Sequence, residues 1–223
     1  TYPARFRCVI GTGSAHPVVL YGHGLLGNRS EVDFFGGFAD VLAGCATDWI
    51  GMADEDIPTV IEILADQSRF NEQADRMQQG QLAFQLLGML VNRPDGFAGD
   101  HAFQGADGQP LISNDNTMFL GNSQGGILGG ATTAISTEWD RAVLGVPAMN
   151  YSLLLTRSSN WPRFQEFYDA AYPDPVDRVL GIQLAQLLWD RGENQGYAQH
   201  LTSDPYEGFA AKPILLIGAF GDH

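Results

Sequence analysis

One serine of this chain stands in a setting that could make it a nucleophile. Residues 121–125 read Gly-Asn-Ser-Gln-Gly, so Ser123 has a glycine two positions away on either side. Glycines at these positions leave room for a sharp turn that holds the serine backbone in a strained conformation. Residues 117–120 predict an apolar strand before the turn, and residues 124–134 predict a helix after it. The alternative is a serine that only caps this helix.

A second glycine-rich loop could supply what a nucleophilic serine needs. Residues 22–27 read Gly-His-Gly-Leu-Leu-Gly and follow the apolar run 17–21. The oxyanion of a tetrahedral intermediate requires two aimed hydrogen-bond donors. One would be the backbone N–H of Gln124, and the other the backbone N–H of Leu25, with Leu26 as the alternative. His23 and Gly24 would support the loop, which lacks the glycine patterns of phosphate-binding loops.

An acid and a base must complete such a site. Asp222 follows the apolar run 213–217, in the position where the acid is expected after a late strand; the alternative is an ordinary loop aspartate. None of the five histidines is a convincing base. His16 and His101 precede strands, His23 lies in the oxyanion loop, His200 lies near the end of the segment 151–203, and His223 adjoins Asp222. We therefore expect a truncated chain whose catalytic histidine lies beyond residue 223.

These motifs resemble those of the α/β-hydrolases, and among them bacterial lipases and esterases with a His-Gly-Leu oxyanion loop and a Gly-His-Ser-Gln-Gly-Gly elbow. The loop here reads His-Gly-Leu-Leu-Gly from His23, and the elbow has Asn122 in place of the histidine. Because of this difference the motif does not identify the subfamily, but it does not change the expected mechanism, since the residue beside the nucleophile takes no part in proton transfer. The resemblance implies ester hydrolysis through an acyl-enzyme on Ser123, without a cofactor.

The elements that would position these residues alternate along the chain. Apolar runs predict strands at residues 5–10, 17–21, 44–50, 117–120, 142–146 and 213–217. Helical spacing is found at residues 34–42, 56–64, 75–90 and 124–134, and residues 95–116 predict a long loop. Such alternation indicates one α/β domain over residues 1–223, a mostly parallel sheet with helices on both faces.

The segment 151–203 breaks this alternation with proline-interrupted, aromatic-rich helical sequence. We interpret it as a helical cap over the site, the alternative being ordinary helices that cover the sheet. Leu153, Leu154 and Trp161 are then candidates for a substrate pocket, together with Trp49 at the end of a predicted strand. Apolar lining suits an acyl chain, because each buried methylene contributes about 0.8 kcal/mol.

The composition of the chain indicates which classes of ligand it can bind. The net charge of −14 makes nucleic acid an unlikely ligand, and no apolar stretch reaches the roughly 18 residues of a membrane span. No metal-binding motif is present, so we expect a small ester or lipid as substrate. Cys8 and Cys45 could form a disulfide, but two buried free thiols are favoured. A secreted or periplasmic location is expected rather than a cytoplasmic one.

Two other functions remain open. The same machinery serves other acyl hydrolases, such as peptidases and polyester depolymerases. A hydrolase-like binding module without catalysis is the alternative from a different class, favoured by the lack of a usable histidine. A fluorophosphonate probe distinguishes these classes, since it labels only an activated serine.

Overall fold

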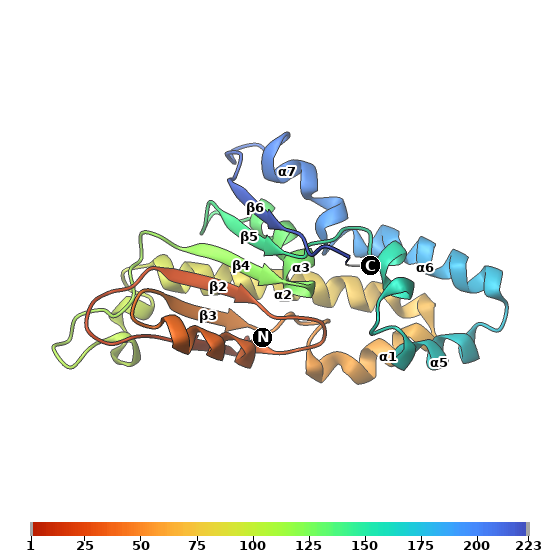
Figure 1. Ribbon diagram of the computed structural model, residues 1–223, viewed down its shortest axis with the longest axis horizontal. Coiled ribbons are helices and arrows are strands. Elements are labelled where there is room, and N and C mark those ends of the chain that lie inside the picture. The colour runs from red at the N-terminus through yellow and green to blue at the C-terminus, as the bar shows by residue number, and fades with distance from the viewer. Residues whose placement is uncertain (1, 222–223) are drawn as a thin grey trace.

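A computed structural model describes residues 2–221 and contains a six-stranded sheet (Figure 1). The strand order is β1-β3-β2-β4-β5-β6, and every pairing is parallel except that of β1 with β3. The strands are β1 (Phe6–Val9), β2 (Val18–Gly22), β3 (Ala43–Thr47), β4 (Met118–Asn122), β5 (Ala142–Gly145) and β6 (Ile214–Ile217). The predicted α/β class and the mostly parallel sheet are confirmed.

The register of the central strands sets the location of the site. In the pairing of β2 with β4, Gly22 lies opposite Gly121, so the two glycine-rich loops leave the sheet at the same edge. Every residue of β2 is buried, as expected of a central strand with both faces covered. The carboxyl ends of parallel strands are where such sheets bind ligands.

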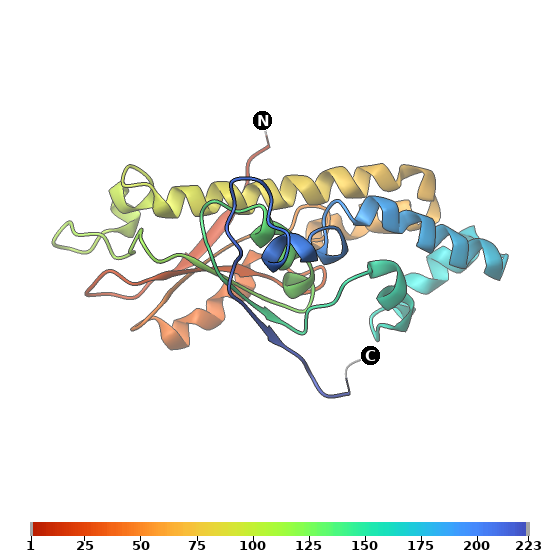
Figure 2. The ribbon, with the colours of Figure 1, turned by 90° about the horizontal axis from the view of Figure 1, so that it is seen from above.

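Helices cover the two faces of the sheet. The long helix α2 (Phe70–Asn92) and helix α3 (Gln124–Ala134) pack on one face, where Phe84, Leu87 and Leu128 contact the buried side chains of β2 and β4. The 3-10 helix η1 (Arg29–Phe38) packs on the other face. Figure 2 shows α2 and η1 on opposite sides of the strands.

A group of helices lies beyond the carboxyl ends of the strands (Figure 1). It comprises α1 (Ile57–Ala65), α4 (Tyr151–Leu154), α5 (Pro162–Ala171) and α6 (Pro175–Trp189). Leu64 of α1 packs with Phe164 and Ile182 in a hydrophobic cluster separate from the main core. The end of the predicted cap differs, because η7 (Asn194–Gly196) and α7 (Ala198–Thr202) pack against α3 instead.

Several predicted boundaries shift. Residues 29–38 form the 3-10 helix η1 instead of an α-helix over 34–42, and α2 is longer than the predicted 75–90. The long loop contains 3-10 turns η4 (Phe97–Gly99) and η5 (His101–Phe103), and two more, η2 (Asp54–Asp56) and η3 (Gln67–Arg69), flank α1; η6 (Leu155–Arg157) follows α4. No helix of residues 2–221 is both long and apolar enough to cross a bilayer.

Cys8 and Cys45 form a disulfide, so the preference for two free thiols is corrected. The two residues face each other in the antiparallel pairing of β1 with β3. That pairing brings together residues 37 positions apart, a contact that composition and spacing do not reveal. The disulfide fixes the edge strand β1 to the buried strand β3.

The single lysine of the chain is buried beneath the end of α3. Lys212 Nζ donates hydrogen bonds to the carbonyl oxygens of Thr133 (2.6 Å), Ser136 (2.5 Å) and Trp139 (3.2 Å). These oxygens lie at and just after the carboxyl end of the helix, where a cation is favourable. Lys212 therefore ties the approach to β6 to the helix that follows Ser123.

Strand β6 is the open side of the described sheet. It pairs with β5, and Leu215, Leu216 and Ile217 are all exposed. Since successive side chains of a strand point to opposite faces, β6 exposes apolar groups on both faces.

Candidate active site

Ser123 forms the turn between β4 and α3. Its backbone has φ 56° and ψ −124°, a conformation that costs free energy for any residue with a side chain. The turn is held by hydrogen bonds from the Ser123 N–H to the Gly145 oxygen (3.0 Å) and from the N–H groups of Gly126 (2.8 Å) and Ile127 (3.0 Å) to the Ser123 oxygen. Ser123 itself is half-buried, so its side chain remains accessible.

At two glycines of the motif another part of the backbone comes so close that no side chain would fit. A Cβ atom on Gly121 would overlap the carbonyl oxygen of Gly125, and a Cβ on Gly125 would overlap the carbonyl oxygen of Gly22. The first contact closes the turn around Ser123. The second brings the turn against the start of the loop 22–27.

The Gln124 side chain joins the turn to this loop. Its Nε2 donates to the carbonyl oxygens of Gly24 (3.2 Å) and Met52 (2.8 Å), and its Oε1 accepts from the N–H of Leu26 (3.4 Å). Gln124 is fully buried, so water does not compete for these bonds. The residue next to Ser123 thus fixes the loop that faces it, a role that the sequence analysis did not assign to its side chain.

The two backbone N–H groups predicted as oxyanion donors make no hydrogen bond to any described residue. Gln124 opens α3, whose first N–H groups have no partner within the helix. In the loop, the Leu26 N–H bonds to Gln124 while the Leu25 N–H does not. This difference favours Leu25 over Leu26 as the second donor.

His23 supports the loop from inside. Its side chain is completely buried, and its Nε2 lies 2.9 Å from the backbone nitrogen of Trp49. A backbone N–H can only donate, so Nε2 accepts and Nδ1 carries the proton that bonds to the Gly24 oxygen (2.9 Å). Burial lowers the pKa of His23, which keeps the ring neutral. Gly24 is held by its own N–H, which donates to Glu31 Oε2 (3.0 Å).

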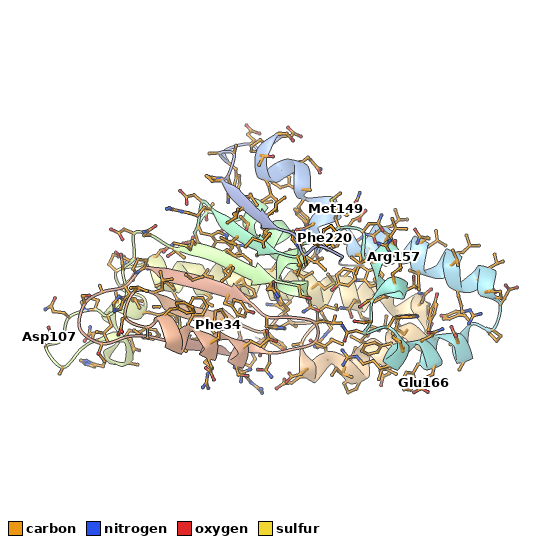
Figure 3. All side chains as sticks on the ribbon, in the orientation of Figure 1. Phe34, Asp107, Met149, Arg157, Glu166 and Phe220 are labelled. Carbon is orange, nitrogen blue, oxygen red and sulfur yellow. A yellow bond between two sulfur atoms is a disulfide. The ribbon has the colours of Figure 1, made fainter. Side chains whose placement is uncertain are left out.

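The other described histidines are held elsewhere. His16 lies at the amino end of β2, where its backbone bonds to Leu111. His101 belongs to η5, in the loop that also carries Asp107; Figure 3 shows Asp107 at the end of the molecule opposite the cap residue Glu166. The His200 ring stacks on Tyr206 at 3.9 Å. None of the four histidines in residues 2–221 forms a hydrogen bond with Ser123; Asp222 and His223 lie outside the described residues.

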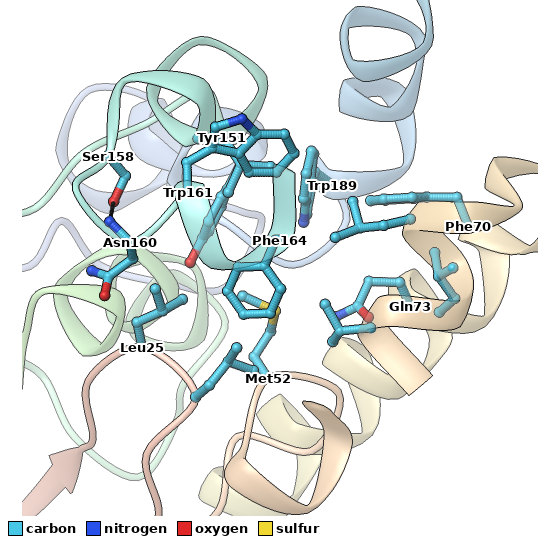
Figure 4. A pocket seen from close by; sticks show the side chains of 15 residues that line it. Leu25, Met52, Phe70, Gln73, Tyr151, Ser158, Asn160, Trp161, Phe164 and Trp189 are labelled. Carbon is cyan, nitrogen blue, oxygen red and sulfur yellow. Dashed lines mark hydrogen bonds between the residues drawn. The ribbon is translucent and has the colours of Figure 1, made fainter. Parts of the chain in front are cut away.

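A small cavity lies between the loop 22–27 and the helices that follow β5 (Figure 4). Its volume is about 50 Å³, and Leu25 and Leu26 form the wall nearest the loop. The remaining lining residues come from the 52–73 region and from the cap: Met52, Val60, Ile63, Leu64, Phe70, Gln73, Tyr151, Leu155, Ser158, Asn160, Trp161, Phe164 and Trp189.

Of the four residues predicted to line a substrate pocket, one lines this cavity and three do not. Trp161 lines the cavity. Leu153 does not, because its side chain points to solvent and is 55% exposed, and Leu154 packs against the main core. Trp49 is also removed from the cavity, since its ring is buried against Phe84 at 4.0 Å. These three residues therefore do not line this cavity.

Two residues that the sequence analysis missed attach the segment after β5 beside the turn at Ser123. The buried Glu193 carboxylate accepts from the backbone N–H groups of Asn150 (3.1 Å) and Gln195 (2.8 Å). Its neighbour Asn194 donates through Nδ2 to the oxygens of Gly126 (3.1 Å) and Ala148 (3.0 Å). Burial raises the pKa of Glu193. A polar pair after a largely apolar helix has no distinctive signature, so only the fold identifies this attachment.

The described residues contain no group of three or more acidic, histidine or cysteine side chains placed to hold a metal ion. The described residues combine a half-buried serine in a strained turn, two backbone N–H groups that have no partner among them, and a cavity lined by Leu25 and Leu26 of the loop packed against that turn. This combination can stabilise an oxyanion on a carbonyl group attacked by Ser123.

No protein-family model and no curated protein sequence matches the chain. Solved structures do. Acetyl xylan esterase 1 from Thermoanaerobacterium sp. JW/SL YS485 has a TM-score of 0.54 at 15% identity, over 99% of this chain and 74% of that one. An acetyl xylan esterase from Paenibacillus sp. R4 has a TM-score of 0.49 at 14% identity, over 99% and 75%. A lipase in its open form has a TM-score of 0.43 at 12% identity, over 96% and 74%. At these identities the likeness to the first structure shows the fold alone, which is that of the α/β-hydrolases.

Proposed function

We propose that this chain of α/β-hydrolase fold is a serine hydrolase that cleaves carboxylic esters. The observation that carries the proposal is the conformation of Ser123, strained at φ 56° and ψ −124° and packed against the loop 22–27. Strain of this kind persists only where the surrounding structure enforces it, and it concentrates at functional sites. A helix cap has no need of it, and Ser123 makes no side-chain capping bond.

In the proposed reaction, Ser123 Oγ bonds to the acyl carbon while its proton passes to a histidine. The carbonyl oxygen becomes an oxyanion held by the N–H groups of Leu25 and Gln124. The bond to the alcohol oxygen then breaks, the alcohol leaves with the proton, and water releases the acid by the reverse sequence. Asp222 is proposed to orient the histidine, which is none of the four in the described residues.

The small cavity lined by Leu25 supports an ester with a short acyl part. Other acyl hydrolases, such as peptidases and polyester depolymerases, would use the same serine and donors, and their substrates differ in the leaving group. The Cys8–Cys45 disulfide supports our proposal of a periplasmic or extracellular location, because disulfides persist in oxidising compartments.

A fluorophosphonate probe on the natural gene product tests the proposal. We expect labelling at Ser123, and the Ser123→Ala variant should lose labelling together with about three orders of magnitude or more of p-nitrophenyl ester turnover. Ser14→Ala, at an exposed turn, is the matched control and should keep both. Turnover retained in Ser123→Ala would place the nucleophile elsewhere, and an unlabelled wild-type protein would favour a binding module.

A further inference from the structure

The apolar cavity contains a polar group without a partner. Trp189, on the last turn of α6, lines the cavity and is only 5% exposed, yet its indole Nε1 has no hydrogen-bond partner among the described residues. In Figure 4 the nitrogen end of this ring is directed into the space above Gln73 and Met52. The Phe70 ring packs edge-to-face against Trp189 at 4.7 Å, but a ring face is a much weaker acceptor than an oxygen.

A second polar group faces the same space. Gln73 is buried on α2, and its Nε2 donates to the Gly51 oxygen (2.7 Å). That bond fixes the orientation of the amide and leaves Oε1 without a hydrogen bond to any described residue. At this cavity Trp189 Nε1–H is therefore a donor and Gln73 Oε1 an acceptor without a partner among the described residues, and the polar side chains of Tyr151, Ser158 and Asn160 also line it.

A buried donor or acceptor without a partner destabilises the folded protein unless a ligand forms a hydrogen bond with it. A buried donor left unpaired loses its hydrogen bonds to water with nothing in return, and native proteins pair more than nine-tenths of these groups. A site that holds them among apolar walls discriminates strongly against ligands that cannot pair with them. A hydroxyl group can accept from Trp189 and donate to Gln73 at the same time.

We propose that the cavity selects acyl groups that carry a hydroxyl, so that short hydroxyacyl esters are preferred to plain alkanoyl esters. This rests on the proposed ester hydrolysis at Ser123. Leu25 and Leu26 of the loop 22–27 line the cavity, while Ser123 and Gln124 do not, so the proposed acyl group would pass this loop and extend toward Trp189. Apolar cavities of about 150 Å³ bind benzene, and this one, at about 50 Å³, takes only a few heavy atoms.

Trp189 and Gln73 act on specificity in this proposal and take no part in proton transfer to or from Ser123. Replacing the indole by a phenyl ring removes the donor and keeps an apolar wall. The preference for the hydroxyacyl ester over the plain ester should then fall, and this ratio is the readout because the smaller ring alters the cavity wall for both esters.

The test compares kcat/KM for p-nitrophenyl 3-hydroxybutanoate and p-nitrophenyl butanoate. We expect the wild type to prefer the hydroxy ester by about tenfold or more, as one buried hydrogen bond allows. Trp189→Phe should remove most of this preference, and Gln73→Met should reduce it independently. Trp161→Phe, which changes an indole in the same cavity, is the control and should alter both rates alike.

The outcomes separate the two proposals. Equal wild-type rates on both esters, or a preference that survives in both Trp189→Phe and Gln73→Met, would overturn the hydroxyl selectivity and leave the esterase standing. Turnover of neither ester, with Ser123 unlabelled by the probe, would overturn the proposed function and the selectivity with it.

Discussion

His23 shows how a side chain without a part in the reaction can still govern the site. Both of its ring nitrogens are engaged, one as acceptor from Trp49 and one as donor to Gly24. A proton on Nε2 would replace the bond to Trp49 by a repulsion between two donors. The loop that presents the Leu25 N–H therefore depends on a neutral imidazole.

Acid should weaken the protein through this residue. Burial lowers the pKa of folded His23 below its ordinary value of 6.5. Between the two pKa values the unfolded state binds more protons, so this contribution to stability is complete above about pH 6.5 and declines as the pH falls. Urea unfolding from about pH 7.5 to about pH 5 should show a steeper loss of unfolding free energy in the wild type than in His23→Gln. Parallel curves would contradict the prediction.

At the scale of elements, apolar runs located the strands well. Residues 17–21 and 117–120 were predicted as strands, and β2 and β4 differ from these ranges by one or two residues. Fully buried parallel strands need continuous apolar sequence, so their signal is local. The elbow was equally visible, because the glycines that relieve its backbone contacts lie within two residues of Ser123.

The cap could not be resolved in the same way. Tyr151 is buried in the cavity wall while Leu153, two residues later, is exposed. In a helix as short as α4, the direction of each side chain is decided by packing against α6, which the local sequence does not encode. The long-range contacts of Glu193 and Gln124 were missed for the same reason, since their partners are distant in the chain.

The disulfide between β1 and β3 yields a prediction for these elements. Closing a loop between residues 37 positions apart restricts the unfolded chain, which stabilises the folded state by about 2–4 kcal/mol. Chemical denaturation with and without a reductant should show a loss of this size. The Cys8→Ala/Cys45→Ala double variant should be insensitive to reductant. A wild-type protein that reductant leaves equally stable would contradict the prediction.

At the scale of the whole chain, β6 has one neighbour among residues 2–221, and this has consequences for the solubility of the 223-residue chain taken by itself. Unpaired backbone groups and apolar side chains on both faces make a strand a template for association. The net charge of −14 opposes association through long-range repulsion, which salt screens.

Self-association of the 223-residue chain should therefore increase with ionic strength and proceed through β6. Leu216→Lys should lower the amount of aggregate measured by light scattering at high salt, since a lysine on an edge strand disfavours pairing. Leu82→Lys, at an exposed leucine of α2, introduces the same charge away from the edge and should have a smaller effect. Equal protection by both variants would show that charge alone, and no particular edge, controls association.

The burial of Lys212 also determines how this protein could be fixed to a solid support. Amine-reactive resins normally couple through surface lysines, and here the one lysine side chain is engaged with three carbonyl oxygens inside the molecule. Forcing that reaction would free the end of α3, the helix that begins beside Ser123. The acidic surface offers the alternative: carbodiimide chemistry would attach the protein through its many carboxylates and leave the interior intact.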